Sequence, residues 1–244
     1  MVQFLYQRLL QFWHGLFPSF CLLCRLHSSG GQLLCVDCYR SLPWLQACCV
    51  RCGNVLSHAD LNLCGHCLKQ PPLWQTTLAA CQYQTPVITF IHRLKFQKQL
   101  IYAQLLAQLL LGKLQSYYQY HALPECIIPV PLHPQRLKER GFNQVVEIAR
   151  ILSKKLQIPL NRYHGLRIHA TLPQAHLSQS QRQQNVTKAF KIQPGFKFKY
   201  VAIIDDVVTT GNTILAFAQA LRQAGVENIA VWCCAHTQML KNVI

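Results

Sequence analysis

The sequence contains few acidic residues. In 244 residues, 8 Asp and Glu stand against 24 Lys and Arg, which gives a formal net charge of +16. This excess favours anionic partners such as phosphate esters, nucleic acids or acidic surfaces. Residues 148–204 contain ten basic residues and no acid. A solvated basic surface that aids solubility is the alternative interpretation of this stretch.

Long apolar runs are also missing, since none approaches the ~20 residues that span a bilayer. The opening segment MVQFLYQRLLQFWHGLF is interrupted by polar residues, and it lacks the charged start and cleavage site of a signal peptide. We expect residues 1–20 to form an amphipathic helix that docks on the rest of the protein, with a membrane-surface role as the alternative. We expect no transmembrane segment and a cytoplasmic location.

Cysteine, in contrast, is abundant, with 13 residues. Eight of them form four C-x-x-C pairs: Cys21/Cys24, Cys35/Cys38, Cys49/Cys52 and Cys64/Cys67. Each C-x-x-C turn presents two thiolates, and two turns complete a tetrahedron around Zn²⁺. We predict two structural zinc ions with sequential pairing of the turns, because this closes the shorter loops. Interleaved pairing, an iron–sulfur cluster and a disulfide framework, which needs an oxidising compartment, are the alternatives.

The composition predicts a small metal-stapled domain followed by a larger one. Residues 21–69 are too few for an independent core, so we expect zinc to hold them together as a double zinc ribbon. The turn-rich QPPLW (residues 70–74) would link this ribbon to a domain over residues 75–244. The other cysteines of that domain lie in apolar surroundings and are predicted to be core residues: Cys81, Cys126, Cys233 and Cys234.

The larger domain alternates predicted strands with predicted helices. Short apolar runs at residues 125–131, 201–205 and 228–235 are typical of buried strands. Apolar residues recur at helical spacing over 145–156 and from Thr213 to a stop at Gly225, and residues 100–114 form a further apolar helix. This alternation predicts an α/β fold, a parallel sheet with helices on both faces.

The stretch VAIIDDVVTTGNT (residues 201–213) places a quarter of all acids, Asp205 and Asp206, at the end of one of these strands. Ligands of parallel sheets bind beyond the carboxyl ends of the strands. The following loop leads into a helix, whose N-terminal amides and dipole favour a phosphate. A ribose between the loop and the acids would separate like charges, and Mg²⁺ would offset the remainder. An ordinary strand–turn–helix would explain the threonines but leave the paired acids unexplained.

This stretch resembles the phosphoribosyl pyrophosphate (PRPP) signature of type I phosphoribosyltransferases. Three further segments restrict the resemblance to one family. They are PVPLHPQRLKERGFNQ (129–144), FIHRLKF (90–96) and LPQAHLSQSQRQQN (172–185). Together with the leading cysteines, they are similar to the ComF/GntX family of competence-associated, phosphoribosyltransferase-like proteins. The resemblance implies a type I phosphoribosyltransferase-like sheet preceded by a zinc ribbon.

The resemblance also implies roles for individual residues. Asp205 and Asp206 would hold the ribose at the catalytic centre. The 5′-phosphate would bind the loop made of Val207, Val208, Thr209, Thr210, Gly211, Asn212 and Thr213. Arg136 and Arg140 would hold the pyrophosphate, since a guanidinium bonds phosphate oxygens in a planar fork; an exposed charged turn is the alternative. Arg182 and Asn185 would belong to a mobile loop over the site, and Lys95 would make an accessory contact.

Two functions of different classes follow from the resemblance. The first is an enzyme of DNA uptake that binds Mg-PRPP and transfers phosphoribosyl to an acceptor that the sequence does not identify. The second is a non-catalytic competence protein that binds single-stranded DNA and keeps PRPP as a regulator or relic. Phe196 and Phe198 could stack on bases, although we expect them at the edge of a strand. Competence-machinery proteins are further expected partners.

Overall fold

The computed structural model describes residues 19–28, 31–58, 61–168 and 189–238. The chain divides into two compact units, residues 1–43 and 44–244. The amphipathic helix expected over residues 1–20 falls outside the described residues, apart from the last two. The larger unit contains the second cysteine cluster as well as the sheet, and the predicted domain boundary near residue 70 stays a prediction.

The smaller unit is built around the first four zinc-ribbon cysteines. Strand β1 (Ser19–Phe20) pairs antiparallel with β2 (His27–Ser28), and helix α2 (Val36–Arg40) follows. Leu34 and Leu42 are buried, and the Ser28 hydroxyl donates to the Gln32 carbonyl oxygen at 2.8 Å. The buried groups among the described residues of this unit are too few to hold those residues together without a staple.

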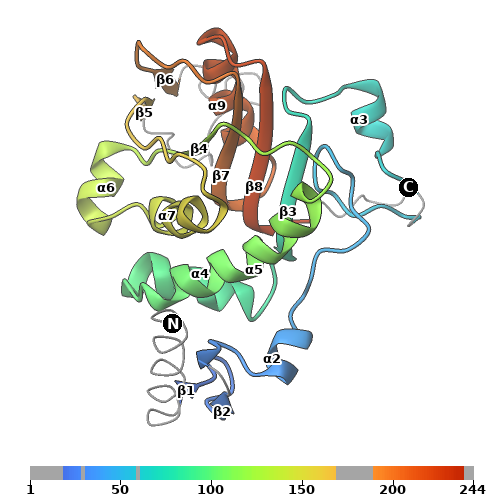
Figure 1. The fold of residues 1–244 in the computed structure, drawn as a ribbon, viewed down its shortest axis with the longest axis vertical. Helices are drawn as coiled ribbons and strands as arrows, with labels where there is room; N and C mark the ends of the chain where they lie inside the picture. The colour runs from blue at the N-terminus through green and yellow to red at the C-terminus, as the bar shows by residue number, and fades with distance from the viewer. Residues whose placement is uncertain (1–18, 29–30, 59–60, 169–188, 239–244) are drawn as a thin grey trace, which may run out of the picture. The chain divides into compact units, whose positions relative to one another are not determined.

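A four-stranded parallel sheet forms the centre of the larger unit (Figure 1). Its order is β3 (Thr76–Gln82), β8 (Asn228–His236), β7 (Tyr200–Val208) and β4 (Cys126–Pro129). Three of these strands correspond to the predicted ones, whereas β3 was missed. The predicted parallel sheet is therefore confirmed, and β7 lies in its interior with a neighbour on each side.

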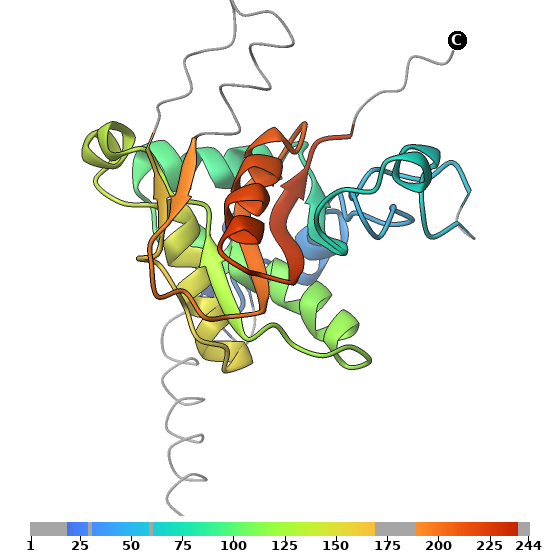
Figure 2. The same cartoon turned by 90° about the horizontal axis from the view of Figure 1, so that it is seen from above.

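Helices cover both faces of the sheet, as Figure 2 shows from above. The buried Trp232 indole donates to the Tyr118 hydroxyl of α5 (Ile101–Tyr118), while the adjacent Cys233 belongs to the core that contains Phe217 of α9 (Asn212–Gln223). Successive strand residues point to opposite faces, so α5 and α9 lie on different sides. Helices α4 (Val87–Gln97) and α7 (Gln144–Leu156) pack against α5.

Smaller elements complete the larger unit. They are α3 (Gly65–Lys69), α6 (Pro134–Arg140) and an antiparallel hairpin of β5 (Gly165–Arg167) and β6 (Phe190–Ile192). The expectation that Phe196 and Phe198 lie on a strand is wrong. Both lie in the connection between β6 and β7. Their ring centroids are 5.4 Å apart, and both side chains pack against the core.

Four cysteines outside the C-x-x-C pairs are buried as predicted, namely Cys81, Cys126, Cys233 and Cys234. Within the described part of the chain, no helix is both long and apolar enough to cross a membrane.

Candidate metal and phosphate sites

The eight C-x-x-C cysteines gather into two separate clusters: Cys21, Cys24, Cys35, Cys38 and Cys49, Cys52, Cys64, Cys67. Within each cluster all Sγ atoms lie within 4.8 Å of one another. Cys24 and Cys35 are 3.7 Å apart at Sγ, as are Cys52 and Cys64. Zn–S bonds of about 2.3 Å in a tetrahedron require sulfurs roughly 3.8 Å apart. Both clusters therefore have the geometry of a Cys₄ zinc site, with the sequential pairing that was predicted.

Backbone hydrogen bonds lower the pKa of one thiol in each cluster. Burial opposes ionisation of Cys21, but the backbone amides of Cys24, Cys35 and Leu23 lower its pKa to about 6. Burial likewise opposes ionisation of Cys49, and the amides around it lower its pKa to about 7. Because zinc binds thiolates, these amides favour the form that ligates the metal.

The acid pair lies at the carboxyl end of β7, and Asp206 faces a buried network of polar side chains. Asp206 is 3% exposed. The Lys95 ammonium of α4 is 2.7 Å from its Oδ2, and the buried Gln144 amide of α7 donates to the same oxygen at 2.9 Å. Arg140 in turn donates to Gln144. One cation and one amide therefore hold this carboxylate.

Among the residues that the structure describes, no cation forms an ion pair with Asp205. The Asp206 backbone amide donates to its Oδ1 at 2.9 Å. Burial raises the pKa of Asp205 to about 8, the neighbouring Asp206 charge adds to this, and Lys95 opposes it. A cation brought close to Asp205 would favour its ionised form. In the described part of the chain, the charge of Asp206 is therefore paired with Lys95, whereas Asp205 has no ion pair.

Residues 207–213, here called the phosphate loop, carry the chain from β7 into α9. Val208 is buried, whereas Thr209 and Thr210 are exposed. Gly211 caps the helix with φ of 77°, a left-handed conformation that favours glycine. The first amides of the 12-residue helix α9 follow directly. The loop therefore offers hydroxyls and amide donors to an anion.

Arginines gather near the acid pair. Arg140 lies over the Phe96 ring at 5.6 Å, and burial lowers its pKa, opposed by Asp206 and assisted by Arg136. Burial also lowers the pKa of Arg167 on β5, with Arg136 assisting and Asp205 opposing. Arg136 itself is exposed on α6. Arg136 thus influences the charge of both Arg140 and Arg167, and each of these two is also influenced by one acid of the pair.

Two residues of this arrangement were missed from the sequence as members of the site. Gln144 begins α7 and reaches Asp206 across 62 positions of the chain. Arg167 is one of ten cations in an acid-free stretch, and no local pattern distinguishes it from the others. Arg182 and Asn185 lie outside the described residues.

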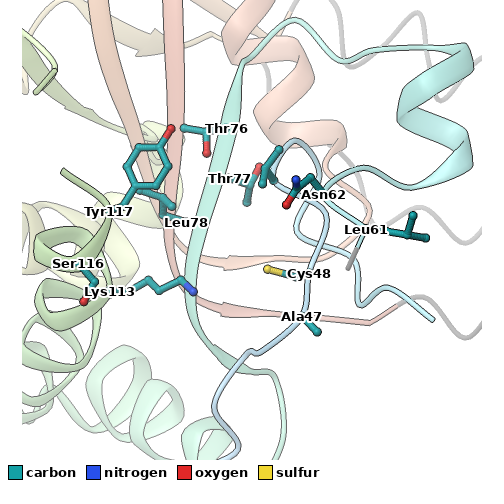
Figure 3. A pocket seen from close by; sticks show the side chains of 11 residues that line it. Ala47, Cys48, Leu61, Asn62, Thr76, Thr77, Leu78, Lys113, Ser116 and Tyr117 are labelled. Atoms are coloured by element: carbon teal, nitrogen blue, oxygen red, sulfur yellow. The ribbon is translucent and has the colours of Figure 1, made fainter. Parts of the chain in front are cut away.

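A separate pocket of about 350 Å³ opens beside β3 (Figure 3). Cys48 and Asn62 line it on one side, and Lys113, Ser116 and Tyr117 of α5 line it on the other. Burial raises the pKa of the Cys48 thiol, and the Lys113 charge opposes the shift. The acid pair and the phosphate loop contribute no residue to this pocket.

Comparison with protein families agrees with this architecture. A model of the double zinc ribbon domain matches residues 12–68, and a model of the phosphoribosyl transferase domain matches residues 143–240. Fold, cysteine clusters and family models together define a protein with a phosphoribosyltransferase-type domain and a zinc ribbon in front of it.

Similar proteins cover almost the whole chain. DNA utilization protein YhgH of Escherichia coli K12 is 34% identical over 223 residues, which are 90% of this chain and 98% of that protein. Competence protein F of Haemophilus influenzae is 37% identical over 222 residues, 87% of this chain and 94% of that protein. Competence protein ComFC of Streptococcus pneumoniae is 25% identical over 229 residues, which are 86% of this chain and 96% of that protein. This protein belongs to the family of competence protein F and DNA utilization protein YhgH, which confirms the resemblance found from the sequence.

Proposed function

We propose that this protein binds PRPP with Mg²⁺ at the acid pair and the phosphate loop, and that it uses this site in DNA uptake. The relatives named for competence and DNA utilization support the cellular role. The observation that supports PRPP as the ligand is the placement of two acids at the end of a strand, directly before a loop that leads into a helix. A ribose 5-phosphate fits both parts, because its phosphate suits the loop and its hydroxyls can donate to the acids.

The charges around the site suit the remainder of the ligand. Lys95 neutralises Asp206, so the ribose hydroxyls meet a pair with reduced net charge. Arg136, Arg140 and Arg167 would face the pyrophosphate, since guanidinium groups bond phosphate oxygens in a planar fork. Mg²⁺, held through ligand oxygens and a carboxylate, would supply positive charge to the departing pyrophosphate.

With these groups in place, the chemistry would be transfer of phosphoribosyl to an acceptor. The bond between the anomeric carbon and pyrophosphate breaks, the bond to the acceptor forms, and pyrophosphate leaves with the electron pair. The acid pair would stabilise positive charge that develops on the ribose. The protein contributes mainly positioning and electrostatics to such a reaction, and we propose that it acts in the cytoplasm.

Binding of single-stranded DNA is the second candidate. It is favoured by exposed cations on the β5–β6 side of the larger unit, among them Arg162, Lys191 and Lys197. Base stacking is less favoured, because Phe196 and Phe198 are partly buried against the core. In this alternative, PRPP would regulate the protein or be a relic, and proteins of the competence machinery would be partners.

Transformation frequency in cells that carry Asp205→Asn with Asp206→Asn separates the candidates. We expect transformation to fall while the purified variant still binds single-stranded DNA, because the substitutions alter the PRPP site alone. Normal transformation, with salt-sensitive DNA binding retained, would instead leave a DNA-binding protein with a vestigial site. Melting temperature of the variant controls for loss of fold.

A further inference from the structure

The turn that carries two zinc ligands of the second cluster packs directly on the sheet. We call residues 49–55 the second zinc turn. The Thr77 amide of β3 donates to the Val50 carbonyl oxygen at 2.7 Å. A Cβ on Gly53 would lie 2.9 Å from the His236 ring and 3.1 Å from the Thr77 methyl group. The turn and the strands therefore meet without room for one extra carbon.

Trp74 connects this turn to the phosphate loop. Its indole Nε1 donates to the Arg51 carbonyl oxygen at 2.7 Å and to the Thr77 hydroxyl at 2.9 Å. Arg51 stands between the zinc ligands Cys49 and Cys52. At its other end, the buried ring reaches within 3.9 Å of the point where a Cβ of Gly211 would lie. A single rigid side chain thus spans from the zinc turn to the loop.

A second route joins the same two segments. The Val55 amide donates to the Gln238 side-chain oxygen at 2.6 Å, and the Thr237 amide donates to the Val208 carbonyl oxygen at 2.9 Å. Val208 lies inside the phosphate loop. The tryptophan is also anchored from the helix that follows the loop, because Arg222 of α9 donates to the Leu73 carbonyl oxygen at 2.8 Å. The loop is therefore held on several sides by groups attached to the zinc turn.

We propose that Trp74 is a positioning residue through which the second zinc centre fixes the phosphate loop for its anionic ligand, the 5′-phosphate of PRPP. The inference rests on the proposed function for the identity of that ligand. Zinc bound at Cys49 and Cys52 sets the direction of the Arg51 carbonyl group between them, and that group orients the indole. The first zinc cluster lies in the other unit and contributes none of the contacts on which this inference rests.

Two tryptophan variants separate positioning from general stability. Trp74→Phe removes the indole hydrogen bonds to Arg51 and Thr77. Trp232→Phe is the matched control, because it removes a buried indole hydrogen bond to Tyr118 on the opposite face of the sheet. We expect the first variant to weaken Mg-PRPP affinity about tenfold, which corresponds to about 1.4 kcal/mol, and the second to change it less than twofold. Thr77→Val, which removes the shared hydroxyl and keeps the shape, should act in the same direction as Trp74→Phe.

Zinc-ligand variants test the metal's part, with zinc content measured in each. Cys67→Ser should lose one zinc per chain and accelerate hydrogen–deuterium exchange of residues 209–213 without any ligand present. Cys38→Ser should also lose one zinc but leave exchange in this loop as in the wild type. Exchange is measured on the protein without ligand, so its result does not depend on whether PRPP is the ligand. Failure of the wild-type protein to bind PRPP would refute the proposed function and leave the link between the zinc turn and the loop intact. Equal loop exchange in both cysteine variants, or unchanged loop exchange in Trp74→Phe and Thr77→Val, would overturn the inference.

Discussion

Lys95 and Asp206 form an ion pair of 2.7 Å, with the carboxylate side chain 5% exposed and the lysine side chain 21% exposed. A helix that precedes β7 by more than a hundred residues thus supplies the counter-charge for one of two adjacent acids. This contact explains how a strand end can carry like charges side by side. Asp206 is thus stabilised by a contact within the protein, and the ligand role of Asp205 stays a proposal.

Replacing Lys95 by Met should destabilise the protein, because the buried Asp206 would lose its ion-pair partner and keep only Gln144 as a side-chain donor among the described residues. A buried charged group that loses its partner costs about 2–3 kcal/mol in the free energy of unfolding. Urea denaturation at pH 7.5 measures this change. Lys155→Met, on an exposed face of α7, is the control, and an equal effect in both variants would contradict the role of the ion pair.

The raised pKa of Asp205 predicts a pH dependence of stability. Its folded-state pKa of about 8 exceeds the ordinary value for aspartate, about 3.9, so the folded state binds this proton more tightly than the unfolded state. The stabilisation is complete below the ordinary pKa and is lost as pH rises through about 8. Unfolding of zinc-loaded, magnesium-free protein between pH 5 and 9 should show this loss, and Asp205→Asn should reduce it. A wild-type curve that rises toward pH 9 would show that Asp205 is ionised without ligand.

Zinc content is predicted at two ions per chain. The two clusters have sulfur separations that fit a zinc tetrahedron, and each should load independently because they lie in different units. Elemental analysis of purified protein measures the stoichiometry directly. Iron in place of zinc, or one metal shared between the clusters, would contradict this assignment.

The elements predicted from the sequence are those whose signal is local. The run VAIID and the loop after it predicted a buried strand, its end and the start of α9, because apolar length and a glycine turn are read from neighbouring residues. Strand β3, TTLAACQ, was missed because its two alanines have weak strand propensity and interrupt the run of larger apolar residues that marks a buried strand. Its place at the sheet edge depends on pairing with β8, which only the fold supplies.

The candidate site likewise contains residues that could be predicted from the sequence and residues that could not. The acids and the phosphate loop were visible because they are contiguous in the chain. Gln144 and Arg167 were not, because their relation to the acids arises from packing of α7 and from the β5–β6 hairpin. Lys95 was indicated by resemblance to a family, and its direct contact with Asp206 could not be read from the sequence.

If single-stranded DNA binds the larger unit, exposed lysines near β6 should contribute through phosphate contacts. Lys191→Ala with Lys197→Ala should weaken binding and reduce the slope of log affinity against log salt by about 0.7 for each lost contact. Fluorescence anisotropy with an oligonucleotide at several salt concentrations measures both quantities. Lys69→Ala, on α3, serves as the control, and an unchanged slope in the double variant would exclude this face from DNA binding.

Calorimetric titration of the protein with PRPP and Mg²⁺ tests the central claim most directly. The wild type should bind one PRPP per chain, and Asp205→Asn with Asp206→Asn should weaken the affinity several-fold or more while the protein stays folded. Glu227→Gln, an exposed acid paired with Lys199 away from the site, should bind as the wild type does. Unchanged PRPP affinity in the double variant would contradict the assignment of the acid pair to the ribose.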